Sequence, residues 1–440
     1  MKPRNLLIAA VVLAALSGLV WYSKQHPPSS ATSTASSTTP KLVDIPEKDV
    51  RSIDLKKKDG TAVTLDREGG KWAITAPESW RVDQDAATSL FSSLNPVSAD
   101  SVVEDNATDL AKYGLTSPSL TVSVRETSGK SDSIQFGDDV PAGSLVYARV
   151  NTSPKVYAVA SSVKSSLDKS ANDLRDKRLL TFDTNKLTRV DLLSGKSEVE
   201  FGKNNQNEWQ ILKPQPYRAD SFQVEELLRK LSDAKMDLSG NAETNQKAAA
   251  AYTTGSADGS VKVSDASGTQ TLDVRKNKDD YYAKSSVVPG VYKVSADLGK
   301  ALDKSVDDFR NKKIFDFGFN DPTKIDIQSV SGSKSLIRSG TDWKMNGKTM
   351  DPGGVQAFID KLRDLSAAKF LPSGFTSPAL TITVTSNDGK RTERVEFAKT
   401  ADAYIARREN EPALYSLEQK PVNDILEAGN AIKPTASTKK

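Results

Sequence analysis

The sequence predicts an α+β protein: three tandem repeats of a mainly antiparallel β-sheet module with two packed helices each, preceded by one transmembrane helix. Three observations predict this fold: a tryptophan that recurs at a regular interval, a helical stripe that follows it each time, and a phrase that occurs twice. The phrase "LDKSANDLRDKRLLTFD" at Leu167 returns as "LDKSVDDFRNKKIFDFG" at Leu302. A duplicated active site would need two sets of catalytic partners, whereas a structural repeat needs only a second copy of its surroundings.

The tryptophans give the period of the repeat. Trp72, Trp209 and Trp343 each follow an alternating strand pattern, which reads "VRSIDL", "LTRVDLL" and "TKIDIQSV" in the three copies. Alternation of apolar and polar residues is typical of a strand with one buried face. Three strand starts at similar distances from a tryptophan therefore indicate three modules.

An aspartate and a helical stripe follow each tryptophan. The aspartates stand where an N-cap would accept a hydrogen bond from free backbone N–H groups, and Pro352 suits the first helical position. Apolar residues at plus four, seven, eight and eleven then form one face of a helix. The three sets are Asp83 with Ala87, Leu90, Phe91 and Leu94; Asp220 with Val224, Leu227, Leu228 and Leu231; and Asp351 with Val355, Phe358, Ile359 and Leu362.

The later strands show that the second copy diverges. Copies one and three read "GLTSPSLTVSV" from Gly114 and "GFTSPALTITV" from Gly374, whereas copy two reads "GSADGSVKVSD" from Gly255. A second helix is expected to close each module. The basic "DLRDK" segment follows it in copy one, with "DFRNK" in copy two, and has no equivalent after "NDILEAGNAI" in copy three. We interpret the repeated phrase as a connector between modules.

The amino terminus predicts an uncleaved membrane anchor. Residues 6–22 are free of charge, Lys2 and Arg4 precede them, and Trp21 and Tyr22 stand at an interfacial position. The positive residues predict a cytoplasmic amino terminus and a periplasmic remainder, in a bacterial inner membrane. The predicted parts are 1–5 cytoplasmic tip, 6–22 anchor, 23–42 flexible Ser/Thr/Pro linker, 43–183 first repeat, 184–320 divergent second repeat, 321–433 third repeat and 434–440 tail.

Composition excludes several chemistries. The chain has no cysteine, and its one histidine, His26, lies in the predicted linker. Disulfides, thiolate catalysis and histidine-based triads are therefore excluded from the folded part. A net charge of +4 is too small to favour a nucleic acid partner. We expect no cofactor, no metal and no catalytic residue.

Four arginines form the candidate ligand or partner surface. Arg175 and Arg310 lie in the repeated phrase, and Arg81 and Arg218 precede the cap aspartates in "WRVD" and "YRAD". An aromatic residue beside an arginine suits a carboxylate or a sugar. Charges near the ends of helices are also common without function, because the helix dipole favours cations at the carboxyl end.

Several segments together resemble a known family. "DLAKYGLTSPSLTVSV" from Asp109, "IQFGDD", "VYARV" and "DLRDKRLLTFD" are similar to the bacterial domain-of-unknown-function family 4340. The resemblance is best over residues 70–185 and returns at 374–384. It implies an amino-terminal membrane anchor and an auxiliary role beside ABC transporter components of the gliding-motility-associated type. The family has no established catalytic residues to carry over.

These observations favour a non-catalytic, membrane-anchored periplasmic scaffold or substrate-handling accessory of an ABC-type transport complex. Its partners would be the inner membrane, through residues 6–22, and the transporter's membrane subunits. Two alternatives remain open: a periplasmic glycan hydrolase that uses a carboxylate pair, and a stand-alone carbohydrate- or lipid-binding protein. The first requires two facing carboxyl groups in a cleft, and the second a groove lined by apolar or aromatic residues. The sequence leaves the oligomeric state open.

Overall fold

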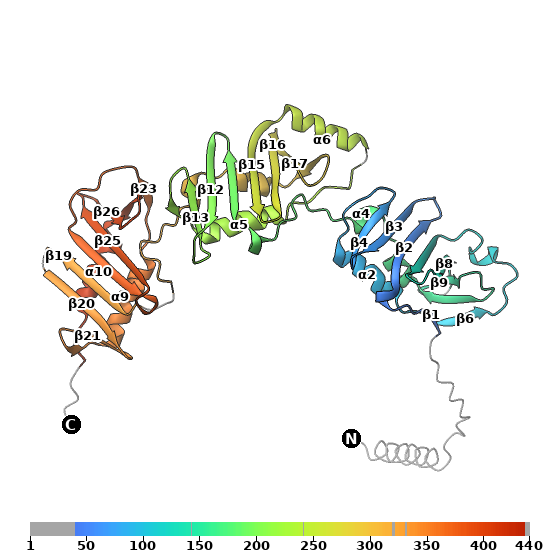
Figure 1. Ribbon diagram of the computed structural model, residues 1–440, viewed down its shortest axis with the longest axis horizontal. Coiled ribbons are helices and arrows are strands. Elements are labelled where there is room, and N and C mark those ends of the chain that lie inside the picture. The colour runs from blue at the N-terminus through green and yellow to red at the C-terminus, as the bar shows by residue number, and fades with distance from the viewer. Residues whose placement is uncertain (1–39, 142, 241, 319–321, 331, 436–440) are drawn as a thin grey trace, which may run out of the picture. The chain divides into compact units, whose positions relative to one another are not determined.

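The computed structural model describes residues 40–141, 143–240, 242–318, 322–330 and 332–435. The chain divides into two compact units, one ending at Asp176 and the other beginning at Lys177. The first unit holds one large antiparallel sheet with its helices and a separate two-stranded sheet, and the second unit holds two large sheets (Figure 1). Each large sheet has its own buried apolar core. The predicted α+β class with several mainly antiparallel sheet modules is therefore confirmed.

The first sheet has the strand order β4-β3-β2-β7-β8-β9-β10-β6. Its strands are β2 (Val50–Lys57), β3 (Ala62–Glu68), β4 (Lys71–Ala76), β6 (Ser101–Glu104), β7 (Leu120–Glu126), β8 (Ser131–Asp139), β9 (Leu145–Val150) and β10 (Val156–Ala160). Its helices are α2 (Gln84–Leu94), α3 (Ser161–Leu167) and α4 (Ala171–Leu174), and β1 (Lys41–Val43) pairs separately with β5 (Val97–Ser98).

The second sheet has the order β14-β13-β12-β11-β15-β16-β17-β18. Its strands are β11 (Arg189–Ser194), β12 (Ser197–Lys203), β13 (Trp209–Lys213), β14 (Tyr217–Arg218), β15 (Ser256–Asp265), β16 (Gly268–Asn277), β17 (Asp280–Ser285) and β18 (Val291–Val294). Its helices are α5 (Ser221–Ser232), α6 (Ala242–Thr254), α7 (Ala296–Leu302) and α8 (Val306–Phe309).

The third sheet has the order β22-β21-β20-β19-β24-β25-β26-β27-β23. Its strands are β19 (Lys324–Ser329), β20 (Gly332–Ser339), β21 (Asp342–Met345), β22 (Lys348–Thr349), β23 (Lys369–Leu371), β24 (Leu380–Ser386), β25 (Arg391–Lys399), β26 (Ala403–Arg408) and β27 (Leu414–Glu418). Two helices, α9 (Pro352–Asp364) and α10 (Gln419–Ala431), lie side by side against it (Figure 1).

The three tryptophans occupy equivalent strands. Trp72 lies on β4, Trp209 on β13 and Trp343 on β21, each the third strand of its sheet in chain order, and all three are buried. In each sheet this strand pairs with the one before it, so it carries the chain away from the centre of the sheet. The tryptophan period therefore marks a repeated packing position, as the sequence predicts.

The predicted helices begin at the predicted caps. The side chains of Asp83, Asp220 and Asp351 accept hydrogen bonds from the first free N–H groups of α2, α5 and α9. The residues that each helix buries include all four members of its predicted stripe. An amphipathic face recurring every 3.6 residues is sufficient to fix which side of the helix meets the sheet.

The second helix differs between the copies. In the first two modules a capped break divides it into α3 with α4 and α7 with α8, and Ser170 and Ser305 form capping boxes at the break. In the third module α10 is continuous. The second module also contains α6, which packs on β16, β17 and β18. The described residues of the first module include no such helix. There Tyr113 and Leu115, from the Tyr-Gly-Leu segment, form a small apolar cluster with Val156.

The predicted membrane anchor at residues 6–22 lies outside the described residues. Among the residues that are described, no helix has the length and apolar character needed to cross a membrane.

Candidate functional site

The repeated phrase forms two connectors, which we define as residues 174–182 and 309–317. The start of each connector pairs with the segment that precedes a cap aspartate, here called the cap loop (residues 80–83 and 217–220). Val82 forms an isolated antiparallel bridge with Arg175, and Ala219 forms the same bridge with Arg310. Flanking hydrogen bonds join Asp83 N to Leu174 O (2.8 Å), Asp176 N to Arg81 O (2.9 Å), Asp220 N to Phe309 O (2.7 Å) and Asn311 N to Arg218 O (2.9 Å).

The next connector residues pair with the segment that follows the first helix of the second or third module. Leu179 N donates to Ala234 O, and Ile314 N donates to Leu365 O. The bridges Arg178 with Lys235 and Lys313 with Ser366 lie beside these bonds. In the first module β1 and β5 form the same pairing. The first residues of each connector therefore form backbone hydrogen bonds with one module. Its later residues form backbone hydrogen bonds with the following module.

The third module ends with the same backbone pairing. Met350 bridges Pro434, Asp351 N donates to Lys433 O at 2.8 Å, and Thr435 N donates to Thr349 O at 2.9 Å. Copy three has no equivalent of the basic "DLRDK" segment in its sequence, but its carboxyl-terminal backbone makes the same pairing as the connectors. The carboxyl-terminal segment pairs with the cap region of α9 without an equivalent of Arg175 or Arg310, because backbone hydrogen bonds require only an extended chain.

The guanidinium groups of the connector stack on the aromatic residues of the cap loops. Arg175 lies 4.7 Å from the centre of the Trp80 ring. Arg310 lies 4.0 Å from Tyr217 and 3.5 Å from Phe370, and it is buried. A desolvated guanidinium between two aromatic faces is strongly favourable. Because Phe370 lies on β23, Arg310 joins the second module to the third within the second unit.

Arg218 forms ion pairs on both sides of the same junction. Its Nε lies 2.8 Å from Glu411 and its Nη1 lies 3.2 Å from Asp316. Its Nη2 also donates to Tyr415 Oη at 3.2 Å. Arg81, the equivalent residue of the first module, lies 4.0 Å from the carboxylate of Asp176. The four candidate arginines thus divide into two pairs, Arg81 with Arg175 and Arg218 with Arg310, one pair at each cap loop.

A buried network extends from Arg218 into the third module. Glu411 also contacts Arg408 at 2.7 Å, and Arg408 contacts Glu393 at 2.9 Å. Glu393 in turn accepts hydrogen bonds from the backbone N–H of Asp316. Neither Arg408 nor Glu393 is among the candidate residues that the sequence predicts. One signal was present, because Arg408 continues the inward-facing series of Tyr404 and Ala406 on β26, and a charge there implies a buried partner.

The network perturbs the acidity of its members. Burial alone would raise the pKa of Glu411, but the charges of Arg218 and Arg408 outweigh it, so this pKa lies below its ordinary value. Burial is also the largest reason that the pKa of Tyr415 rises to about 12. Glu411 is therefore ionised and Tyr415 protonated at neutral pH, a combination that stabilises ion pairs.

A cleft of about 700 Å³ lies beside the network, within the second unit. Its lining includes Arg218, Asp220, Asp316 and Glu411, together with the exposed ring of Phe222. Three of its carboxylates are already engaged: Asp220 caps α5, and Asp316 and Glu411 pair with Arg218. A general acid for glycoside hydrolysis needs a raised pKa, whereas that of Glu411 is lowered.

One group of carboxylates could in principle hold a metal ion. The carboxylate oxygens of Asp191, Glu198 and Glu200 lie within 4.8 Å of one another. Arg189 lies 2.9 Å from Asp191 and 3.0 Å from Glu200, and Lys213 lies 3.0 Å from Glu200. These two cations already neutralise most of the negative charge that would attract a divalent ion.

The fold and the junction together define a class of protein: tandem antiparallel α+β modules joined by docked connector straps. The chain belongs to the family described as a domain of unknown function (DUF4340), whose model matches residues 72–210 and again residues 209–379. No curated protein matches the chain, and no solved structure matches it.

The family matches are offset from the structural modules. The first match begins at Trp72 on β4 and the second at Trp209 on β13, so each starts on the third strand of one sheet and ends in the following module. Each matched segment therefore includes a cap loop, the first helix that follows it and a complete connector. The divergent second module, which lacks the Tyr-Gly-Leu element, also falls within the matched residues.

Proposed function

We propose that this protein is a non-catalytic scaffold or substrate-handling accessory of an ABC-type transport complex, anchored by residues 6–22 in a bacterial inner membrane with its modules in the periplasm. The observation that carries the non-catalytic part is the use of two arginines at the second junction, one in the connector and one in the cap loop. Arg310 is buried between two aromatic rings, and Arg218 is held by two carboxylates and a tyrosine hydroxyl. These contacts join the second module to the third.

Of the carboxylates that line the cleft, Glu411 is unsuited to be the general acid of a glycan hydrolase, because its pKa is lowered. A scaffold needs modules that stay joined, and within the second unit the contacts of Arg218 and Arg310 join the second module to the third. The transporter partner and the envelope location rest on the family resemblance and on the charge pattern of the amino terminus.

The test is crosslinking of the full chain, carrying a carboxyl-terminal affinity tag, in its native membrane. We expect capture of the membrane subunits of an ABC transporter. The matched variants are Arg310→Ala, at the junction, and Arg338→Ala, an exposed arginine of the third sheet. The first should reduce capture at unchanged protein abundance, and the second should leave it unchanged. Recovery of no transporter subunit from the wild-type chain would overturn the proposal.

A further inference from the structure

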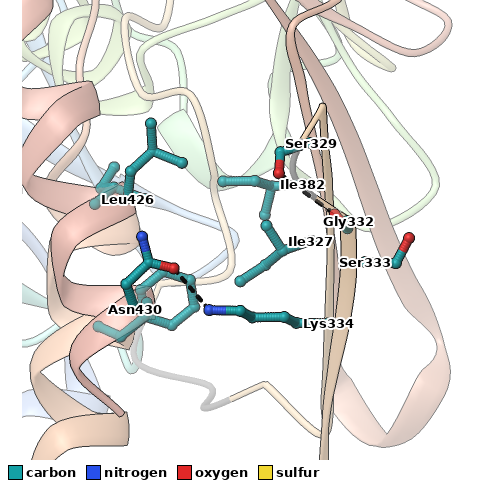
Figure 2. Close-up of a pocket in the computed structure, with 11 residues that line it drawn as sticks. Ile327, Ser329, Gly332, Ser333, Lys334, Ile382, Leu426 and Asn430 are labelled. Atoms are coloured by element: carbon teal, nitrogen blue, oxygen red, sulfur yellow. Dashed lines mark hydrogen bonds between the residues drawn. The ribbon is translucent and has the colours of Figure 1, made fainter.

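A pocket of about 110 Å³ lies in the third module, between its sheet and its two helices (Figure 2). Its floor is apolar, because the almost completely buried Ile382, Phe358 and Ile425 line it, whereas polar residues such as Ser333, Lys334 and Asn430 line its rim. Ile327 and Leu426 complete this floor from β19 and α10. Engineered apolar cavities of roughly 150 Å³ accept benzene, so this space suits a chain of about three to five carbon atoms.

A lysine ammonium lies at the polar side of the pocket. Lys334 extends from β20 toward α10, and its Nζ donates to Asn430 Oδ1 at 2.6 Å (Figure 2). Among the described residues no carboxylate forms an ion pair with Lys334. An ammonium group has three N–H donors, and the bond to Asn430 uses one. Asn430 offers its own Nδ2 donors next to them.

The same position holds a core valine in the other two modules. Ile327 pairs with Lys334 in the third sheet, as Leu55 pairs with Val63 in the first and Leu192 with Val199 in the second. Val63 is 2 % exposed and Val199 is 0 % exposed. A lysine has therefore taken an inward-facing strand position that is otherwise apolar, and a pocket lies in front of its amine.

We infer that this pocket binds a small apolar monocarboxylate, such as a short-chain fatty acid. The carboxylate would accept hydrogen bonds from Lys334 Nζ and Asn430 Nδ2, and the hydrocarbon tail would lie against Ile382 and Phe358. A charge-assisted hydrogen bond at the mouth and burial of a short tail are the two contributions that this geometry offers. The inference concerns the third module alone and does not depend on the proposed transport role.

The test uses the full chain in detergent and saturation-transfer NMR with butyrate as the probe. We expect binding with a dissociation constant in the millimolar range, because so small a ligand buries little surface. Lys334→Met keeps the aliphatic stem and removes the charge, and it should weaken butyrate binding at least tenfold. Lys344→Met, at an exposed lysine of the same sheet, is the matched control and should bind as the wild type does.

A ligand series separates the two parts of the site. Acetate lacks the tail and n-butanol lacks the charge, so each should bind at least several-fold more weakly than butyrate. Equal binding of butyrate to the wild type and to Lys334→Met would overturn the inference, and so would equal binding of butanol and butyrate. Absence of a saturation-transfer signal at butyrate concentrations of tens of millimolar would also overturn the inference. Lys334 would then only extend its aliphatic stem over an apolar surface and place its ammonium group in solvent, as long cationic side chains often do.

Discussion

The guanidinium carbon of Arg310 lies 3.5 Å from the centre of the Phe370 ring, although the two residues belong to different modules of the second unit. The same carbon lies 4.0 Å from the centre of the Tyr217 ring, and Arg310 Nη1 lies 2.9 Å from the Asp307 carboxylate. All three partners lie on different elements. This side chain therefore connects the second helix, the cap loop and the third sheet at one point.

Arg310→Ala should loosen this junction. Loss of two desolvated cation–π contacts should cost about 2 kcal/mol of local stability. The measurement is hydrogen exchange at the amides of Asn311 and Asp220, which bond across the cap loop; their protection should fall roughly thirtyfold. Arg338→Ala, which removes an exposed arginine, is the control. Unchanged protection in Arg310→Ala would show that the backbone bonds alone hold the connector.

Glu411→Gln should destabilise the second unit by about 3 kcal/mol, because it leaves two buried arginines without a shared carboxylate. It should also alter the dependence of stability on pH. The folded pKa of Glu411 lies below the ordinary value of 4.5, so its contribution is fully present above that value and is lost as the pH falls through the folded pKa.

Urea unfolding of the second unit at about pH 7 and about pH 3 provides the measurement. The wild type should lose more stability between the two conditions than Glu411→Gln does. Glu418→Gln, which changes an exposed glutamate at the end of β27, is the matched control. A variant as acid-sensitive as the wild type would contradict the assignment of this carboxylate.

Ser194→Lys should stabilise the second module. In the first module Lys57 forms an ion pair with Asp168 at 2.6 Å. Ser194 holds the equivalent strand position in the second module, and it makes only a 3.5 Å hydrogen bond to Asp303. An ammonium introduced there would face Asp303 and the nearby Asp258. We expect a melting temperature higher by about 2 °C for this module. Ser197→Lys, in the same hairpin, should produce no such rise.

Asp258→Asn tests the same place by removing a charge. Burial, followed by the charge of Asp303, raises the pKa of Asp258 above its ordinary value of 3.8. A raised carboxyl pKa means that ionisation destabilises the fold, so stability falls as the pH rises from 3.8 through the folded pKa. The variant should therefore melt at a higher temperature than the wild type at neutral pH and at the same temperature in acid. A lower melting temperature at neutral pH would show that the Asp258 carboxylate is satisfied.

Asp83→Ala should lower the free energy of unfolding of the first unit by about 1 kcal/mol, since the Asp83 side chain accepts hydrogen bonds from the N–H groups of Asp85 and Ala86. Asp85→Ala, in the first turn of the same helix, should cost only a few tenths of that amount because it changes only the dipole interaction. Chemical denaturation followed by tryptophan fluorescence measures both. Equal losses in the two variants would contradict the cap assignment.

Local patterns were sufficient to predict the repeated elements. The tryptophan strands depend on neighbours two residues away, and the cap aspartates and helix stripes on neighbours three or four residues away, so a single sequence carries them. The interruption of the second helix at Ser170 and Ser305 was not predicted. Its signal is a capping box of Ser and Asp three residues apart, which lies inside an otherwise helical pattern.

The sequence by itself determined that the chain repeats one α+β module, where the first helix of each module begins, and that histidine and cysteine chemistry is excluded from the folded part. The tertiary structure decided what the marked arginines contact. Arg310 and Phe370, Arg218 and Glu411, and Lys334 and Asn430 are separated by 60, 193 and 96 residues of chain, taking the differences of their numbers. Such pairs meet only when sheets and connectors have packed, because no local periodicity encodes a contact across that distance.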